Sequence, residues 1–174
     1  MSLHVNDYRA SERTFSLLTQ VIGRAGRGDF PGRAVIQTYA PDNEVITLAC
    51  EQDYDRFYER EIKIRHELTF PPFCDMVQFT VTSVYEDELT RAAERLVAET
   101  AALAGKEYRD LPLCIFGPFE AQLYKAEEKF RMRMIIKCRL TRRTREFFSR
   151  LMIDFCRKAG SKMSISVDIN PSST

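Results

Sequence analysis

The sequence contains few of the residues from which metal sites are usually built. It has only two histidines, His4 and His66, and its five cysteines form no CxxC pair. A zinc site made by this chain alone is therefore not expected. An odd number of cysteines without a secretory signal pattern is typical of a cytosolic protein with reduced thiols, and we expect the cysteines to be buried structural residues.

Long apolar segments are also missing. No run of 18 or more apolar residues occurs, which predicts that no segment spans a membrane. The content of 44% apolar and 11% aromatic residues is nevertheless sufficient for a hydrophobic core and excludes a chain that is disordered throughout. A length of 174 residues fits one ordinary domain or two small ones.

Charge is nearly balanced overall but unevenly distributed. The 26 basic and 25 acidic residues give a net charge of +1, which by itself favours no class of partner. Residues 42–61 carry seven acidic and two basic side chains, whereas residues 125–162 carry thirteen basic and four acidic ones. This asymmetry predicts a surface for a polyanion or an acidic peptide in the last third of the chain.

The first part of the chain, residues 1–70, has the pattern of helices with one short strand. Apolar residues at helical spacing predict a helix over about 11–22, an apolar β-prone run predicts a strand over 34–39, and a second helical pattern predicts one long helix over about 42–68. Pro71 and Pro72 end that helix and mark the domain boundary. One strand cannot enclose a core, so this part is interpreted as the end of a larger α/β lobe.

Residues 71–174 have a different pattern of apolar residues. Alternating or apolar runs predict strands, and two Ala/Leu/Glu-rich or amphipathic stretches predict helices, in the order strand 76–83, helix 86–105, strand 113–117, strand 132–139, helix 141–160, strand 164–169. This βαββαβ order is typical of the ferredoxin-like fold, in which a four-stranded antiparallel sheet has two helices on one face. The predicted class is therefore α+β.

A glycine-flanked pair of arginines is the sharpest local motif. Residues 20–28 read QVIGRAGRG, which places Arg24 and Arg27 three residues apart, close after Gln20. Arginine binds phosphate oxygens with a planar, permanently charged fork, and in phosphoryl transfer such a group stabilises charge on the γ-phosphoryl. The spacing is equally typical of a helix end followed by a flexible glycine turn, and both interpretations stay open.

Two further clusters are candidates for binding polyanions. Basic and aromatic residues alternate through the candidate DNA-binding set Lys125, Lys129, Phe130, Arg131 and Arg133, so phosphates could be neutralised while bases pack on rings. Strand alternation places Arg131 and Arg133 on one face and Met132 and Met134 on the other. The alternative is an amphipathic sheet with a solvated basic face.

The second cluster lies at the start of the predicted helix 141–160. Arg142, Arg143 and Arg145 place positive charge where the helix dipole is also positive, which is locally unfavourable and favours an anionic partner. The alternative is that Arg143 and Arg145 pair with Glu146 or other nearby acids. The sequence leaves these two interpretations open.

Several motifs together resemble the primosomal replication-restart helicases of superfamily 2, over nearly the whole chain. The motifs that carry the resemblance are DYRASERTF (7–15), QVIGRAGRG (20–28), VIQTY (35–39), YDRFYERE (54–61), FPPF (70–73), GP (117–118), FR (130–131) and VDINP (167–171). The chain departs from the family pattern at Ile22, where a small residue is more usual, and at Asn170, where a second aspartate is usual.

The resemblance implies a C-terminal fragment of an ATP-dependent 3′-to-5′ DNA helicase that recognises stalled or branched forks and restarts replication by primosome assembly. ATP and Mg²⁺ would be bound by the full-length parent, and zinc by upstream cysteines. Matched to the family motif, Arg27, Arg24 and Gln20 would contact the γ-phosphate. The fragment alone is expected to have no ATPase activity.

The resemblance also implies partners and a location. These are forked and single-stranded DNA, the acidic tail of single-stranded-DNA-binding protein at Arg142, Arg143 and Arg145, other primosome proteins, and a cytoplasmic, nucleoid-associated location. Two other hypotheses come from the residues. One is a stand-alone ferredoxin-like nucleic-acid-binding module with a helical N-terminal extension, and the other is a small enzyme with Cys74 or Cys114 as nucleophile and His66 as base.

Overall fold

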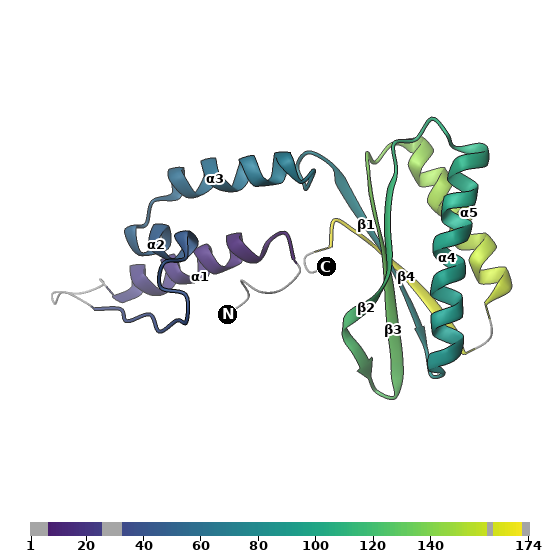
Figure 1. Ribbon diagram of the computed structural model, residues 1–174, viewed down its shortest axis with the longest axis horizontal. Coiled ribbons are helices and arrows are strands. Elements are labelled where there is room, and N and C mark those ends of the chain that lie inside the picture. Colours follow the sequence, from purple (N-terminus) through teal and green to yellow (C-terminus); the bar gives the residue numbers. More distant parts are fainter. Residues whose placement is uncertain (1–6, 26–32, 160–161, 172–174) are drawn as a thin grey trace. The chain divides into compact units, whose positions relative to one another are not determined.

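The computed structural model describes residues 7–25, 33–159 and 162–171. These residues form two compact units, one ending at Thr69 and the other running from Phe70 to Pro171. Figure 1 shows the helices of the first unit and the sheet with its helices in the second. No helix in the described ranges is both long enough and apolar enough to cross a bilayer.

The described part of the first unit is helical. It contains α1 (Ala10–Ala25), α2 (Glu44–Glu51) and α3 (Tyr54–Glu67). The three helices bury one small apolar cluster, made by Phe15, Leu18, Val45, Ile46, Leu48, Ala49 and Phe57. The rings of Phe15 and Phe57 stack with their centroids 4.2 Å apart, which joins α1 to α3.

The prediction of one long helix over 42–68 was wrong, because the helix is broken at Gln52 and Asp53. Gln52 adopts the left-handed conformation with φ of 56°, and its N–H donates to the carbonyl oxygens of Ala49 and Leu48. The Asp53 side chain then accepts a hydrogen bond from the backbone N–H of Arg56 and caps α3. Aspartate is a favourable N-cap, so this local bond competes with continuation of the helix.

The prediction of a strand over 34–39 was also wrong. Residues 33–38 have no regular secondary structure, Val35 is 83% exposed and Tyr39 is fully exposed. A strand is stabilised by hydrogen bonds to a neighbouring strand, and the described residues of this unit provide none. Only Ile36 of this segment packs against the helical cluster.

The second unit contains β1 (Asp75–Ser83), α4 (Glu86–Glu107), β2 (Cys114–Ala126), β3 (Lys129–Cys138), α5 (Arg142–Lys158) and β4 (Met163–Ile169). The sheet order is β2-β3-β1-β4, and every neighbouring pair is antiparallel. Both helices lie on the same face of the sheet (Figure 1). The predicted α+β class, with a four-stranded antiparallel sheet and two helices on one face, is confirmed.

The core of this unit lies between the sheet and its helices. Fully buried side chains come from both layers, namely Val77, Phe79, Val81, Met134 and Ile136 from the sheet and Leu89, Leu96, Phe147, Leu151 and Phe155 from the helices. In β3, Met132, Met134 and Ile136 face this core. Side chains alternate along a strand, so Arg131 and Arg133 lie on the opposite face, as predicted.

The main difference from the predicted elements of this unit is the length of β2. The predicted strand ends at residue 117, whereas β2 continues to Ala126, with an irregularity in its pairing to β3 between Phe116 and Phe119. Glu127 and Glu128 then form the turn, with φ of 51° and 60°. Two left-handed residues in a two-residue loop are typical of a tight hairpin. Proline and charged residues in this segment made it resemble a connection rather than a strand.

Candidate nucleic-acid and partner interfaces

Lys125 and Phe130 of the predicted DNA-binding set lie opposite each other near the tip of the β2–β3 hairpin, and Phe130 packs against the core on the helix-covered side of the sheet. The Lys125 Nζ atom lies 4.7 Å from the centroid of the Phe130 ring. The Tyr124 ring packs edge-on against the same ring at 5.6 Å, and its hydroxyl donates a 2.7 Å hydrogen bond to Glu86 Oε1. That bond raises the pKa of Tyr124 to about 12. Phe130 therefore stabilises the hairpin tip and is not a free stacking surface.

The other three residues of that set lie on the side of the sheet without helices, which we call the open face. Strand register places on it Lys129, Arg131, Arg133 and Lys137 from β3, Gln78, Thr80 and Thr82 from β1, Ser164, Ser166 and Asp168 from β4, and Phe116 and Phe119 from β2. Arg131 lies opposite Thr82 and Arg133 opposite Thr80. Within the described ranges neither arginine has a carboxylate partner. Charges left without partners are available to an external anion.

Arg133 is partly buried. Its Nε atom is buried with no hydrogen-bond acceptor in the described part of the chain. Burial also lowers the pKa of its guanidinium. A buried donor without an acceptor is costly, and a ligand oxygen that reaches it would remove that cost.

Two exposed aromatic residues of the open face are absent from the predicted set. Phe116 is 43% and Phe119 is 44% exposed, and they lie opposite Ile135 and Arg133 of β3. The Lys137 Nζ atom lies 5.6 Å from the Phe116 ring and 3.9 Å from the Phe70 ring. A longer predicted strand would not have revealed them, because side chains three residues apart in a regular strand point to opposite faces. Only the irregularity in the β2–β3 pairing between Phe116 and Phe119 brings both rings to the face of the arginines.

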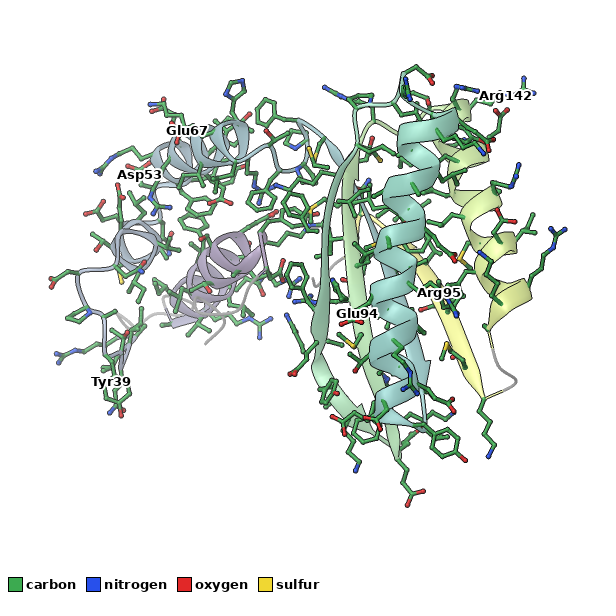
Figure 2. All side chains as sticks on the ribbon, turned by 45° about the vertical axis from the view of Figure 1, so that its right-hand side comes forward. Tyr39, Asp53, Glu67, Glu94, Arg95 and Arg142 are labelled. Atoms are coloured by element: carbon green, nitrogen blue, oxygen red, sulfur yellow. The ribbon has the colours of Figure 1, made fainter. Side chains whose placement is uncertain are left out.

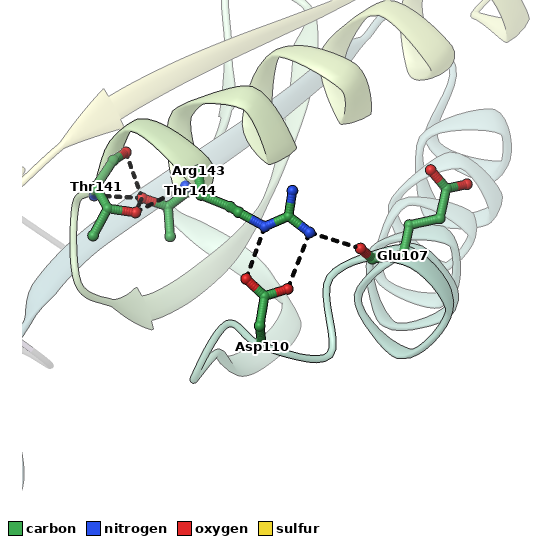
Figure 3. A network of polar contacts seen from close by, with 5 residues as sticks. All are labelled: Glu107, Asp110, Thr141, Arg143 and Thr144. Carbon is green, nitrogen blue, oxygen red and sulfur yellow. Dashed lines mark hydrogen bonds and ion pairs between the residues drawn. The ribbon is translucent and has the colours of Figure 1, made fainter.

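The arginine cluster at the start of α5 is divided by the structure. Arg143 is held in place, since its Nε donates to Asp110 Oδ2 at 2.7 Å and its Nη2 donates to Asp110 Oδ1 and to the Glu107 carbonyl oxygen, both at 3.1 Å (Figure 3). This pair lowers the pKa of Asp110. The alternative of a partner within the chain is thus correct for Arg143, although the acid is Asp110 rather than Glu146.

The other two arginines of the cluster remain accessible. The Arg142 side chain is 95% exposed at the start of α5 (Figure 2), and its ion pair with Glu146 has an N–O distance of 3.2 Å. Arg145 is exposed and has no ion pair within the described ranges. The helix end itself is stabilised by Thr141 and Thr144, which exchange side-chain to backbone hydrogen bonds as a capping box (Figure 3). No acidic residue is needed there.

Two of the three predicted ATP-contacting residues lie on α1. Gln20 and Arg24 are exposed, and together with Thr19 and Gly23 they line a shallow depression. Residues four apart on a helix share a face, so the Gln20 amide and the Arg24 guanidinium point the same way. Arg27 lies outside the described residues.

The cysteines were expected to be buried, and this holds for two of them. Cys74 and Cys138 are buried, whereas Cys50, Cys114 and Cys156 are exposed, and none of these five described residues forms a disulfide bond. Burial raises the pKa of Cys138 to about 11 and also raises that of Cys74. A raised thiol pKa lowers the fraction of nucleophilic thiolate, which argues against catalysis by Cys74.

Asn170, the departure from the family pattern, has a structural role. It adopts φ of 49°, its Oδ1 accepts a 2.9 Å hydrogen bond from the Met76 N–H, and its Nδ2 donates to Asp75 Oδ1 at 3.1 Å. Asparagine tolerates the left-handed conformation better than most residues. An aspartate in the same place could not donate to Asp75.

Comparison with known proteins identifies the same family through a family model and through individual relatives. The family model described as the primosomal protein N C-terminal domain matches residues 66–172. A relative from Bacillus subtilis named "Replication restart protein PriA" is 32% identical over 98% of this chain and 21% of its own length. Relatives of the same name from Chlamydia muridarum and Thermotoga maritima are 30% and 36% identical over 99% and 75% of this chain, and over 22% and 16% of their own lengths.

The chain spans about a fifth of the length of these relatives. A designed protein, Foldit4, superimposes on 57% of this chain and 98% of its own with a TM-score of 0.40 and 10% identity, which is too weak a likeness to support an argument. The family match covers the whole of the sheet and both of its helices. The chain therefore belongs to the family of the primosomal protein N C-terminal domain, and the resemblance carried by its sequence motifs is confirmed.

Proposed function

We propose that this chain is part of an ATP-dependent 3′-to-5′ DNA helicase that recognises stalled or branched replication forks and restarts replication by primosome assembly. Within it, the sheet unit binds DNA. The observation that carries this proposal is the pair Arg131 and Arg133, which lie on the open face of the family domain without a carboxylate partner in the described ranges. Phosphate contacts by such side chains supply most of the sequence-independent affinity for DNA.

In this proposal the α1 residues act on ATP bound elsewhere in the full-length protein. Gln20 and Arg24 are exposed on one helix face, which fits a contact with the γ-phosphate. Arg27 would contribute a third contact. ATP, Mg²⁺ and zinc would be held by segments other than this chain, and the chain alone would bind DNA and partners without ATPase activity, in the cytoplasm at the nucleoid.

The start of α5 is proposed as the partner surface. Arg142 and Arg145 are exposed and suit the acidic tail of single-stranded-DNA-binding protein, while Arg143 holds the loop at Asp110 and supports the surface indirectly. Titration of an acidic peptide against an Arg142→Ala/Arg145→Ala variant tests this. We expect the affinity to fall at low salt, with no change in the melting temperature.

DNA binding is tested by charge reversal on the open face. A Lys129→Glu/Arg131→Glu/Arg133→Glu variant is compared with the unaltered chain by fluorescence anisotropy of labelled forked DNA. We expect at least about a tenfold loss of affinity and a shallower dependence on salt, since each lost phosphate contact reduces the slope by ~0.9. Arg157→Glu on α5, which changes a 75% exposed side chain, is the matched control. Equal affinities of the triple variant and the unaltered chain would exclude this surface.

The second candidate function, a stand-alone nucleic-acid-binding module, requires that the first unit be closed by itself. Several large apolar side chains of that unit are more than half exposed, namely Leu17, Val21, Val35, Tyr39, Tyr54 and Tyr58. A larger motor lobe that covers them explains this exposure better than a closed helical extension does. These residues favour the helicase proposal.

A further inference from the structure

The open face is arranged in parallel strips of different chemistry. Strand β2 contributes the exposed rings Phe116 and Phe119, and β3 contributes the cations Lys129, Arg131, Arg133 and Lys137, with Ile135 between the last two. Beyond them, β1 and β4 contribute the uncharged polar side chains Gln78, Thr80, Thr82, Ser164 and Ser166, together with the buried Met76 at the start of β1. Asp168 is the one carboxylate that the register of the described strands places on this face. Four basic side chains against one acid make the face electropositive.

The rings and the cations are close neighbours. Phe119 lies directly opposite Arg133 on the paired strand, and Phe116 lies opposite Ile135. Residues directly opposite each other in an antiparallel pair have Cβ atoms about 4.5–5.5 Å apart. Phe119 has no aromatic partner among the described residues. An exposed ring can stack with a base, and an arginine without a carboxylate partner can bind the neighbouring phosphate. The two side chains together can therefore bind one nucleotide.

We propose that the open face binds single-stranded DNA, with bases stacked on Phe116 and Phe119 and phosphates held by Arg131 and Arg133. This inference rests on the proposed function and makes it more specific, because only unpaired bases can reach the rings of a flat sheet. The exposed rings favour a nucleic acid over an acidic peptide, since bases stack on rings and carboxylates do not. Neither ring belongs to the predicted DNA-binding set.

Tryptophan fluorescence provides a direct test because the chain contains no tryptophan. A Phe119→Trp variant of the full chain has a single indole on the open face, and an Ile153→Trp variant has a single indole on α5, where Ile153 is 51% exposed. Each is titrated with oligothymidylate of about 12 nucleotides, within the range of site sizes for such surfaces. We expect base stacking to quench the indole of the Phe119→Trp variant strongly and to leave the indole of the Ile153→Trp variant unquenched.

Affinity measurements separate stacking from charge. A Phe116→Leu/Phe119→Leu variant keeps the apolar character of both positions and removes the rings. We expect at least about a tenfold loss of affinity for oligothymidylate with an unchanged salt slope, and recovery in Phe116→Tyr/Phe119→Tyr. Circular dichroism melting curves confirm that each variant is folded.

The outcomes distinguish this inference from the proposed function. If the leucine variant binds oligothymidylate as tightly as the unaltered chain, or if the indole of the Phe119→Trp variant is not quenched at saturation, the stacking surface is wrong. The proposed function would still stand if charge reversal at Arg131 and Arg133 weakened binding to forked DNA. If the unaltered chain binds only duplex DNA, the inference is also wrong. If it binds no DNA, both the inference and the proposed DNA-binding function are wrong.

Discussion

Replacing Gly117 by alanine is expected to destabilise the sheet unit, because the backbone at this position excludes a side chain. Gly117 has φ of +123°, and a Cβ atom there would lie 3.0 Å from the carbonyl oxygen of Arg133 and 3.3 Å from Met134 Cα. Both of these atoms belong to the backbone of β3, so they cannot move aside as the end of a side chain would. The site matters for function because it sets the pairing of β2 with β3 between Phe116 and Phe119.

The loss in free energy of unfolding expected for Gly117→Ala has two contributions. A side chain in a region of backbone conformation that only glycine favours costs about 1–3 kcal/mol, and overpacking against a fixed neighbour costs about 1–3 kcal/mol. The expected loss in free energy of unfolding is therefore about 2–6 kcal/mol. For a domain of this size a loss of about 1 kcal/mol lowers the melting temperature by about 4–8 °C, so the change is easily measured by calorimetry.

Gly105→Ala is the matched control. Gly105 lies within α4, and nothing lies within 4 Å of a Cβ atom at that position. The same substitution there is expected to stabilise the unit by about 0.5–1 kcal/mol, since alanine is the better helix former. The reasoning is refuted if Gly117→Ala melts at the same temperature as the unaltered chain or above it, or if the two substitutions shift the melting temperature in the same direction.

Three other predictions concern local chemistry. Asp110 has a lowered pKa in the folded state because of Arg143, so its stabilising contribution is present above the unfolded pKa of about 3.9 and lost as pH falls through the folded value. Asp110→Asn should therefore lower the melting temperature at pH 6 but not near pH 2, and an equal deficit at both would contradict this. Asn170→Asp replaces a donor to Asp75 by a carboxylate and should cost about 1–3 kcal/mol in urea unfolding at neutral pH, with a smaller deficit below about pH 4. Alkylation followed by mass spectrometry should modify the three exposed cysteines well before Cys138, whose pKa burial raises to about 11, and equal rates would show that the buried thiol is accessible.

The sheet unit was predictable because alternation along a strand is a local property. In β3, the run from Met132 to Ile136 alternates between core and open face as the sequence pattern indicates. The order of strands and helices then restricts the topology, since a split βαβ pattern has few compact arrangements. The family motifs add the identity of the domain, and these also depend only on the order of residues.

Elements that depend on distant partners were not predictable in the same way. The apolar run at 34–39 has the composition of a strand, but without a hydrogen-bonded neighbour in the described part of its unit it stays irregular. The helix over 42–68 is broken by the side-chain bond of Asp53, which competes with an otherwise continuous helical pattern. In the first case the missing partner, and in the second case one side-chain hydrogen bond, outweighs the average preference of the segment.

The sequence by itself determined the fold class of the sheet unit, the family of the chain and the face on which Arg131 and Arg133 lie, because these follow from periodicity and from motifs. Only the tertiary structure decided which charged and aromatic residues are available to a ligand. Arg143 is occupied by Asp110, 33 residues away in the sequence, and Phe130 is packed at the hairpin tip. Phe116 and Phe119 are brought beside the arginines by strand pairing, which no local pattern specifies.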